Sequence, residues 1–323
     1  PAIRLLAPEQ ASAFIQEVSG ASHSGIGLAE LLSVDTSDRS RRITVVTPIP
    51  KTSAARAGLQ PGDVIAVVDG VSTEGMSLED AMVRLRGNPK TQVRLTVLRL
   101  NQKLNITLER EIIQPLKPAV RSTIKPVGGK KIGYIALYQF TSTSAQEMQK
   151  AVNDMLRQGA DAFVLDLRNN PGGDVVMAQQ IAGIFLGAKP MATVLGRGGR
   201  ITQMTAEGKK LTEKPLSVLV NRGTASAAEV LASALRDNQR AKITGVKTFG
   251  KSLIHSLESL TDKSALVVTI GRIRTLKGRE ILNNGITPDV IVNLNLSPIL
   301  NPIKLEATSQ QDTQFQKAVS SLW

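Results

Sequence analysis

Cysteine is absent from this 323-residue chain, and histidine occurs only twice, as His23 and His255. The absence of cysteine excludes disulfides, a cysteine nucleophile and cysteine-ligated metal sites. With two histidines, a histidine-rich metal site is not expected, and few candidates are left for a histidine base. We therefore expect a protein that works without a metal or another cofactor.

Aromatic residues are also scarce, at 3% of the chain, and no apolar run reaches the length of about 20 residues that a membrane span needs. The chain is basic, with 40 Lys and Arg against 27 Asp and Glu, a formal net charge of +13. A basic chain could bind nucleic acid, but the few aromatics and the lack of a nucleic-acid-binding motif argue against it. We expect a solvated basic surface, or one that faces an acidic membrane or partner.

The chain starts at Pro1 without a secretory signal, which predicts a processed protein whose targeting signal lies outside this sequence. Its length predicts about two domains. Residues 1–24, with the candidate amphipathic helix "PEQASAFIQEVSG", are interpreted as the helical remnant of a longer region. At the other end, "DTQFQKAVSSLW" predicts a C-terminal amphipathic helix within residues 303–323.

Residues 25–113 predict a compact module that is mostly β. A helix is predicted for residues 77–86, because Ser77 can cap it and Gly87 can end it, with Met82 and Leu85 on its apolar stripe. The Pro- and Lys-rich segment after this module, residues 114–131, predicts a linker or crossing segment. The predicted strands of the module are "RRITVVTPI", "DVIAVVDG" and the hairpin "QVRLTVLRL" and "KLNITLER".

Residues 114–302 predict an α/β core, in which strands alternate with helices from Ile132 onwards. This alternation is typical of a largely parallel sheet covered by helices, and in such sheets sites form just beyond the carboxyl ends of the strands. Three of these junctions carry polar residues and glycines: "DLRNNPGGD" (166–174), "VNRGTASAAE" (220–229) and "GVKTFGKSLIH" (245–255).

Ser226 lies where the second junction turns into a helix, and it is a candidate nucleophile. A serine needs a base that takes its proton, and the third junction offers Lys251 or His255. Lysine can serve only when neutral, a state that burial favours by lowering the pKa of the amine. The glycines of the first junction and the first N–H groups of the Ser226 helix can point at an anion. Each segment alone usually has only a structural role, and only their joint order favours catalysis.

That order resembles the carboxy-terminal processing peptidases, which are tail-specific serine–lysine proteases and include enzymes that trim the photosystem II reaction-centre precursor in cyanobacteria and chloroplasts. The resemblance implies a PDZ domain plus a crotonase/ClpP-like α/β protease core. It also implies Ser226 as the nucleophile, Lys251 as the general base, and the backbone N–H groups of Gly173 and Ala227 as the oxyanion hole. The motifs that carry it are "DLRNNPGG", "GTASAAE", "TFGKS" and "GITPDV".

His255 departs from the family pattern, which usually has Gln four residues after the lysine. In an extended strand, positions 251, 253 and 255 share a face, so we predict that His255 accepts a hydrogen bond from Lys251 and orients its amine. Two alternatives remain. His255 is itself the base, or a charged His255 keeps Lys251 unproductive.

The segment "SGIGL", which opens the β-rich module, resembles the start of a PDZ domain, as does the later "AGLQPGDVIAVVDG". After Gly25, successive N–H groups of Ile26, Gly27 and Leu28 can form a nest for a C-terminal carboxylate. On the predicted helix, Met82 and Leu85 would favour an apolar terminal side chain.

The predicted function is that of a serine endopeptidase, which recognises protein C-termini through its PDZ domain and cleaves near the carboxyl end with a Ser/Lys dyad. The alternative is a catalytically silent PDZ scaffold that binds C-terminal peptides. The expected partners are C-terminal segments of protein substrates, with peripheral association with a membrane or membrane-protein substrates left open. The expected compartment is the thylakoid lumen or a bacterial periplasm.

Overall fold

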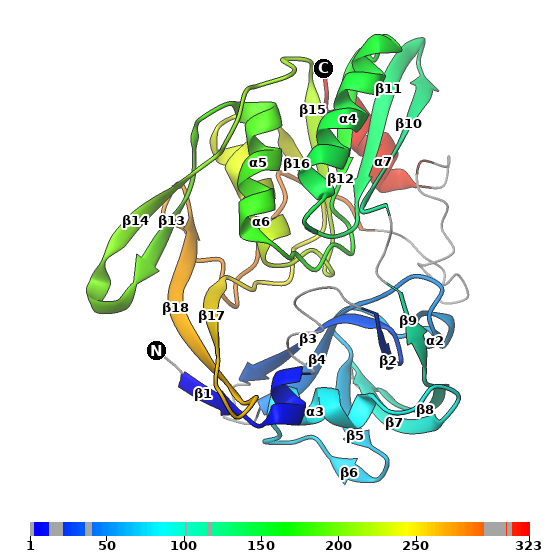
Figure 1. Ribbon diagram of the computed structural model, residues 1–323. Helices are drawn as coiled ribbons and strands as arrows, with labels where there is room; N and C mark the ends of the chain where they lie inside the picture. The colour runs from blue at the N-terminus through cyan, green and yellow to red at the C-terminus, as the bar shows by residue number, and fades with distance from the viewer. Residues whose placement is uncertain are drawn as a thin grey trace. The chain divides into compact units, whose positions relative to one another are not determined.

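The computed structural model describes residues 3–12, 22–35, 41–100, 102–114, 118–293, 308 and 312–323 (Figure 1). The chain divides into two compact units. The first contains Pro1–Pro115 and His255–Thr269, and the second contains Leu116–Ile254 and Ile270–Trp323. The module predicted for residues 25–113 falls within the first unit, which also includes the distant segment 255–269.

The first unit is built on an antiparallel sheet, and the strands and the hairpin predicted for this module are confirmed. The predicted helix is α3 (Leu78–Leu85), and the Ser77 hydroxyl caps it by accepting a hydrogen bond of 3.1 Å from the Asp80 N–H. A two-stranded sheet and the short helix α2 (Ser53–Arg56) complete the described part of the module. In order across the main sheet, the strands are β3 (Leu28–Asp35), β4 (Arg41–Pro48), β5 (Val64–Val68), β7 (Gln92–Arg99) and β8 (Gln102–Glu109); β6 (Val71–Ser72) pairs with β5, and β2 (His23–Gly25) pairs with β9 (Glu111–Ile113).

The N-terminal segment differs in part from the predicted helical remnant. β1 (Ile3–Leu6) is a strand that pairs antiparallel with the start of β18 (Ala265–Thr275), whereas residues 8–12, the described part of the predicted helix, are helical as predicted. The rest of the predicted helix lies outside the described residues. Leu6 and Ala11 are buried with Ala265 and Val267 in a small apolar cluster. A strand forms here because a distant strand offers its edge for pairing, which the local sequence does not reveal.

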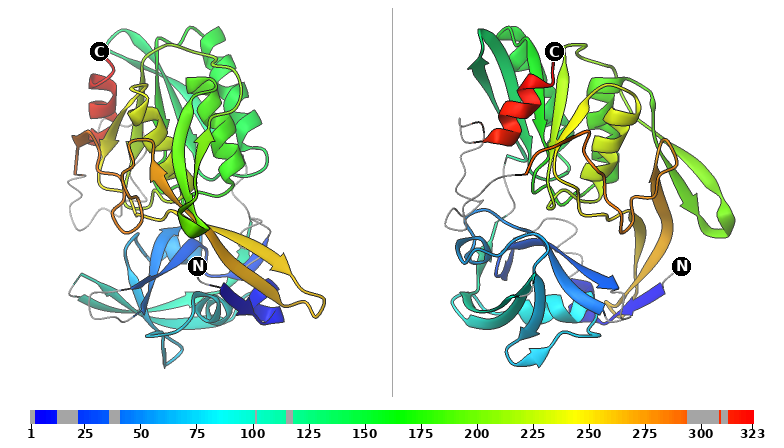
Figure 2. Two further views of the ribbon diagram at one scale, coloured as in Figure 1. Left: turned by 90° about the vertical axis from the view of Figure 1, so that its left-hand side faces the viewer. Right: turned by 180° about the vertical axis from the view of Figure 1, so that it is seen from behind.

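A six-stranded sheet forms the centre of the second unit and is parallel except for its first strand, as predicted. Side chains of alternate residues point to opposite faces: Phe163 and Leu165 face the helices α4 (Ser144–Arg157), α5 (Val175–Leu186) and α6 (Ala227–Asp237), whereas Val164 faces α7 (Thr313–Ser320). The view from behind in Figure 2 shows α7 in front of the strands. In order, the strands are β10 (Val120–Val127), β11 (Lys130–Leu137), β12 (Ala162–Asp166), β15 (Leu216–Val220), β16 (Lys242–Gly245) and β19 (Val290–Ile291).

The prediction of a linker or crossing segment for residues 114–131 is wrong for most of this segment. Residues 120–127 form β10, which pairs residue for residue with β11, from Val120 opposite Leu137 to Val127 opposite Lys130. β10 is the edge strand of the sheet, where Pro126 is tolerated because its missing N–H disrupts no central ladder. The Pro and Lys residues of this segment are therefore those of an edge strand rather than of a linker.

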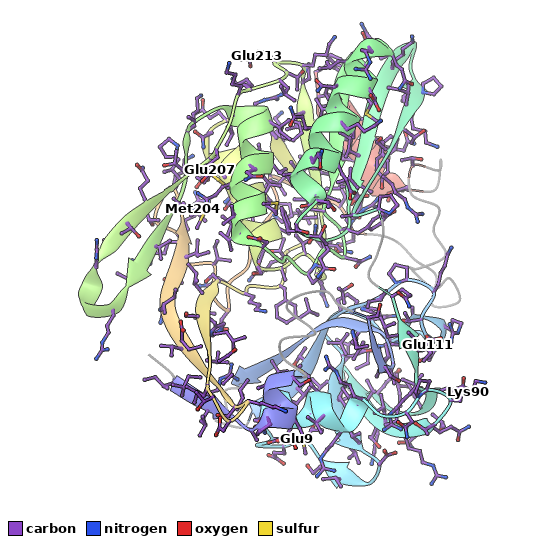
Figure 3. The ribbon with its side chains drawn as sticks, in the orientation of Figure 1. Glu9, Lys90, Glu111, Met204, Glu207 and Glu213 are labelled. Carbon is purple, nitrogen blue, oxygen red and sulfur yellow. The ribbon has the colours of Figure 1, made fainter. Side chains whose placement is uncertain are left out.

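A second set of strands extends from the second unit as a long hairpin. β13 (Pro190–Gly196) and β14 (Ile201–Thr205) are joined by the 3-10 turn η1 (Arg197–Gly199), and β13 also pairs with the second half of β18, which follows β17 (Leu253–Ser259). Glu207, which follows β14, lies beside α5 (Figure 3). Gly183 permits this approach, because a Cβ there would come within 1.7 Å of the Glu207 carbonyl oxygen. Within the described parts of the chain, no helix has the length and apolarity to cross a membrane.

Candidate active site

Ser226 occupies a sharp turn between β15 and α6. Its backbone has φ +54° and ψ −123°, a conformation that costs a non-glycine residue about 1–3 kcal/mol and persists only where the surroundings hold it. The preceding Ala225 N–H donates a 2.9 Å hydrogen bond to the carbonyl of Asn170. The Ser226 side chain is half-buried, so its hydroxyl is placed at a strand-to-helix turn that is still open to a substrate.

The glycines of the first junction pack directly against this turn. A Cβ on Gly172 would lie 2.7 Å from the Cβ of Ser226 and 3.0 Å from the backbone nitrogen of Ala227. A Cβ on Gly173 would lie 2.3 Å from the carbonyl oxygen of Phe140. Only glycine fits at either position, and the structure thereby brings the two predicted oxyanion residues, Gly173 and Ala227, close together.

Asn170 holds this loop in place and was not identified from the sequence. Its buried side-chain amide donates to the carbonyl of Leu137 at 2.8 Å, and its side-chain oxygen accepts from the Gly172 N–H at 2.8 Å. The signal that could have found it is an Asn two residues before a glycine, because Asn side chains commonly bond the backbone two residues further on.

Glu229 connects the second and third junctions through a fully buried carboxylate. One oxygen, Oε2, accepts the N–H groups of Ser226 at 3.0 Å and of Lys251 at 2.9 Å. The other, Oε1, accepts the Gly250 N–H at 2.8 Å and the Thr248 hydroxyl. Because two of these bonds meet at one oxygen, the nitrogens of Ser226 and Lys251 can be no farther apart than the sum of the two bond lengths.

The environment of Glu229 also changes its acidity. Burial raises the pKa of its carboxyl to about 7, although four hydrogen bonds to the carboxylate oppose the shift. This residue too was missed as a functional candidate. The sequence did contain a signal, since Ser226 and Glu229 have the S-x-x-E spacing of a capping box, in which the glutamate accepts the N–H of the capping residue.

Lys251 is half-buried and precedes β17, which begins only at Leu253. Lys251 therefore lies outside the strand, and the prediction that it shares a strand face with residues 253 and 255 is wrong. The cause is the Glu229 carboxylate, which takes the N–H groups of Gly250 and Lys251 away from strand pairing. His255 lies within β17, is exposed, and places its Nδ1 3.2 Å from the Thr269 hydroxyl. Its predicted bond to Lys251 stays a prediction.

A buried ion cluster anchors the start of the glycine loop to α7. The Arg168 guanidinium donates to Asp166 at 2.6 Å and to Asp312, which caps α7, at 2.8 Å. The Tyr134 hydroxyl donates to the same Asp166 carboxylate at 2.7 Å. A buried arginine is tolerated only when it is paired on all sides, so the end of β12 and α7 are held to each other.

A separate pocket, open to solvent, lies in the first unit. Its lining includes all six predicted substrate-binding residues, Gly25, Ile26, Gly27, Leu28, Met82 and Leu85, together with His23 and Arg86.

The carbonyls of Ile26 and Gly27 accept hydrogen bonds from Ala54 and Ile49, whereas no described residue accepts a bond from the N–H of Ile26 or Gly27. Gly27 has φ +85°, and a Cβ there would lie 2.1 Å from the Cβ of Thr52. Glycine at this position therefore lets the loop pack closely and leaves two N–H groups available beside the pocket.

Known proteins match both parts of the chain. Peptidase family S41 matches residues 131–292, and the PDZ domain matches residues 44–99. A carboxyl-terminal-processing protease of Synechocystis is 38% identical over 324 residues, covering 100% of this chain and 73% of that protein. The chloroplastic C-terminal processing peptidase of Tetradesmus obliquus is 34% identical over 318 residues, covering 95% of this chain and 67% of that protein.

A solved structure, described as a photosystem II D1 C-terminal processing protease, has a TM-score of 0.81 and 32% identity, covering 90% of this chain and 78% of that one. The predicted fold, a PDZ domain plus an α/β protease core, is thus confirmed. The chain belongs to peptidase family S41, among the carboxyl-terminal-processing serine proteases that combine a PDZ domain with a peptidase core.

Proposed function

We propose that this protease cleaves proteins near their carboxyl ends with Ser226 as the nucleophile and Lys251 as the general base. The observation that supports this assignment best is the Glu229 carboxylate, which binds the backbone N–H groups of both residues beside the Gly172–Gly173 loop. A shared anchor of this kind fixes the two segments relative to each other, which is what proton transfer between their side chains requires.

In the proposed mechanism, the Ser226 hydroxyl attacks the scissile carbonyl carbon while the neutral Lys251 amine takes its proton. The N–H groups of Gly173 and Ala227 stabilise the oxyanion of the tetrahedral intermediate, and such donors contribute about 2.7–4 kcal/mol each. The Lys251 ammonium then protonates the leaving amine, and the C-terminal fragment departs with a new N-terminus, while the rest of the substrate stays bound to Ser226 as an ester. Water, activated by the same amine, hydrolyses the acyl-enzyme. Glu229 is assigned the role of a positioning residue, because its carboxylate binds the backbone N–H groups of Ser226 and Lys251.

His255 is kept as a proposed orienting partner of Lys251, with the two alternatives that it is the base or that its charged form is inhibitory. Its observed partner, Thr269, lies on the neighbouring strand β18. A role as the base would require a contact with the Ser226 hydroxyl, whereas a role as an orienting group requires only a contact with Lys251.

Substrate capture is assigned to the pocket of the PDZ domain. The N–H groups of Ile26, Gly27 and Leu28 bind the terminal carboxylate, and the apolar floor formed with Met82 and Leu85 takes an apolar terminal side chain. The proposed partners are C-terminal segments of proteins, with peripheral association with a membrane or with membrane-protein substrates. Relatives from cyanobacteria and chloroplasts support a thylakoid lumen or a bacterial periplasm as the compartment.

A gel assay tests the proposed function directly. An unstructured protein with an apolar C-terminus is incubated with the wild-type chain, with Ser226→Ala and with Ser233→Ala. Ser233 is a matched control, because it lies buried in the same helix and bonds only the Val230 carbonyl at 3.1 Å. We expect cleavage by the wild type and Ser233→Ala only. Wild-type rates in Ser226→Ala would refute the assignment, and binding without cleavage by the wild type would favour the silent scaffold.

A further inference from the structure

Two asparagines outside the proposed dyad join the glycine loop (residues 168–173) to the nucleophile turn (residues 221–226). Asn169 comes shortly after β12, and Asn221 directly follows β15, which pairs with β12 in the sheet. The Asn169 N–H donates to the side-chain oxygen of Asn221 at 2.9 Å, and the Asn221 side-chain amide donates to the side-chain oxygen of Asn169 at 2.8 Å. The two loops are therefore cross-linked where they leave the sheet.

Backbone groups fix the orientation of the Asn221 amide. Its oxygen also accepts the Gly223 N–H at 3.0 Å, so that two backbone donors meet at this atom. Since a backbone N–H can only donate, the oxygen must lie on that side, and the amide nitrogen is left to donate to Asn169. Asn169 has φ +57°, a left-handed conformation in which asparagine is enriched. Asparagine therefore suits both positions of the pair.

Thr224 connects this pair to the third junction. Its hydroxyl accepts the Asn221 N–H at 3.0 Å and donates to the carbonyl of Leu167 at 2.8 Å. Its backbone carbonyl accepts the N–H of Phe249, two residues before Lys251, at 3.0 Å. The Thr224 side chain is fully buried, which strengthens its hydrogen bonds. The asparagine pair thus belongs to a network that reaches all three junctions of the site.

A second cross-link between the two loops lies closer to the nucleophile. The Ala225 N–H donates to the carbonyl of Asn170 at 2.9 Å, and Gly172 packs against Ser226 just beyond it. One attachment alone would let the glycine loop rotate about it, whereas two attachments fix its orientation against the turn. Such precision matters because the donors of an oxyanion hole stabilise the transition state only at the right distance from the oxyanion.

We infer that Asn169 and Asn221 are positioning residues for the oxyanion hole, because their paired side chains hold the glycine loop against the nucleophile turn. The inference rests on the proposed function, in which one N–H group from each loop binds the oxyanion. The pair acts through the backbone of the two loops and not on the reacting atoms. Its contribution is made in the transition state, so its loss should lower kcat and leave KM unchanged.

The test replaces each asparagine by aspartate, singly and together. Asn169→Asp keeps the oxygen that accepts from Asn221, and in Asn221→Asp the Asn169 amide can turn and donate to the carboxylate. In the double variant, two carboxylates face each other without a side-chain donor between them. Asn105→Asp, at an exposed asparagine of the first unit, controls for the added charge. Cleavage of an unstructured protein with an apolar C-terminus gives kcat and KM, and the thermal midpoint is measured for each variant.

We expect the double variant to lose about tenfold in kcat with KM unchanged, and each single variant and the control to stay within about twofold of the wild type. A non-additive loss of this kind is expected when two side chains act on each other. If the double variant keeps the kcat of the wild type, or loses only thermal stability, the inference is wrong. It is equally wrong if one single change costs as much as both together.

Asn169→Gly decides the question if the double variant does not fold. Glycine adopts the left-handed backbone without strain, and the substitution removes only the side-chain hydrogen bond, so kcat should fall about threefold in a folded protein. A folded Asn169→Gly enzyme with the kcat of the wild type would overturn the inference. Cleavage by Ser226→Ala at the wild-type rate is a separate outcome, because it would refute the proposed function whatever the asparagine variants do.

Discussion

The catalytic site of the second unit and the pocket of the first unit are both proposed to bind an anion, but they differ in the charged group that lies nearby. Both contain glycines at which a Cβ would collide with a neighbour, Gly172 and Gly173 at one site and Gly27 at the other, and at both we propose that nearby backbone N–H groups bind an anion. At the catalytic site, the nearby fixed charge is Glu229, which is buried and accepts four hydrogen bonds from the protein. In the peptide pocket, the nearby charge is basic, on the half-buried Arg86 of its lining.

The difference follows from the lifetime of the anion. An oxyanion exists only during the reaction, so preorganised neutral donors suffice and a permanent cation would favour binding of other anions. A terminal carboxylate is charged before it binds, so a basic side chain nearby favours its entry from solution. Two similar glycine loops can therefore differ in the charged side chains around them. The difference depends on whether the anion forms in the site during the reaction or binds from solution.

Removing the nucleophile should separate the two sites most sharply. Ser226→Ala is expected to lower the cleavage rate by about 10⁴-fold or more, as the loss of a nucleophile does in other serine proteases, while peptide binding to the pocket stays unchanged. Turnover on a gel and binding by fluorescence anisotropy measure the two effects. Loss of binding together with cleavage would mean that the sites are not independent.

Replacing the general base should have the next largest effect on the cleavage rate. Lys251→Ala should be inactive, because Ser226 then lacks the proposed base, whereas His255→Gln should retain cleavage, since Gln can also accept a hydrogen bond from the lysine. Values of kcat/KM for both variants decide the matter. An active Lys251→Ala enzyme and an inactive His255→Gln enzyme would reverse the two assignments.

Glu229→Gln tests the buried anchor. The amide of Gln can accept with its oxygen only, so part of the network around the backbone N–H groups of Ser226 and Lys251 is lost, and misplacing the reacting groups can cost about 100-fold in kcat. We expect this loss in kcat with little change in KM or in peptide binding. A variant with the kinetic constants of the wild type would show that the backbone hydrogen bonds to Glu229 do not position the dyad.

A pair of glycine substitutions should damage one site each. Gly172→Ala places a methyl group 2.7 Å from the Ser226 Cβ and should reduce cleavage about tenfold or more, whereas Gly27→Ala collides with Thr52 and should weaken peptide binding to a similar degree. Cleavage of a short peptide and anisotropy of a labelled one report on the two sites separately. The reverse pattern, with Gly27→Ala lowering turnover alone, would contradict the proposed division of roles.

The pH dependence of stability should reflect the buried carboxyl of Glu229, apart from any effect on catalysis. Because the folded-state pKa of Glu229 is raised to about 7 from an ordinary 4.5, its burial costs nothing below pH 4.5, where both states are protonated. The cost grows as the pH rises to about 7 and is constant above it, reaching about 3 kcal/mol. Relative to Glu229→Gln, the thermal midpoint of the wild type should therefore be lower at pH 8 than at pH 5. A difference that does not change with pH would argue against the raised pKa.

Much of the fold could be predicted because its signals are local. The strands β4, β5, β7 and β8 follow from β-branched runs between turn residues, and α3 follows from a capping serine and a closing glycine. The site motifs were also readable, since the glycines, Ser226 and Lys251 stand at fixed intervals along the chain. The sequence by itself determined the family, the two kinds of domain and the residues to suspect.

Tertiary structure decided the rest, because the partners of buried polar groups and of edge strands come from distant parts of the chain. In the sequence, Glu229 is an ordinary helical glutamate. Only in the folded chain do Thr248, Gly250 and Lys251 donate hydrogen bonds to its carboxylate. The segment of β10 was predicted as a linker, because its pairing with β11 is not visible in the local sequence. Hydrophobic periodicity records which face of an element is buried, whereas a hydrogen bond between residues far apart in sequence leaves no comparable pattern.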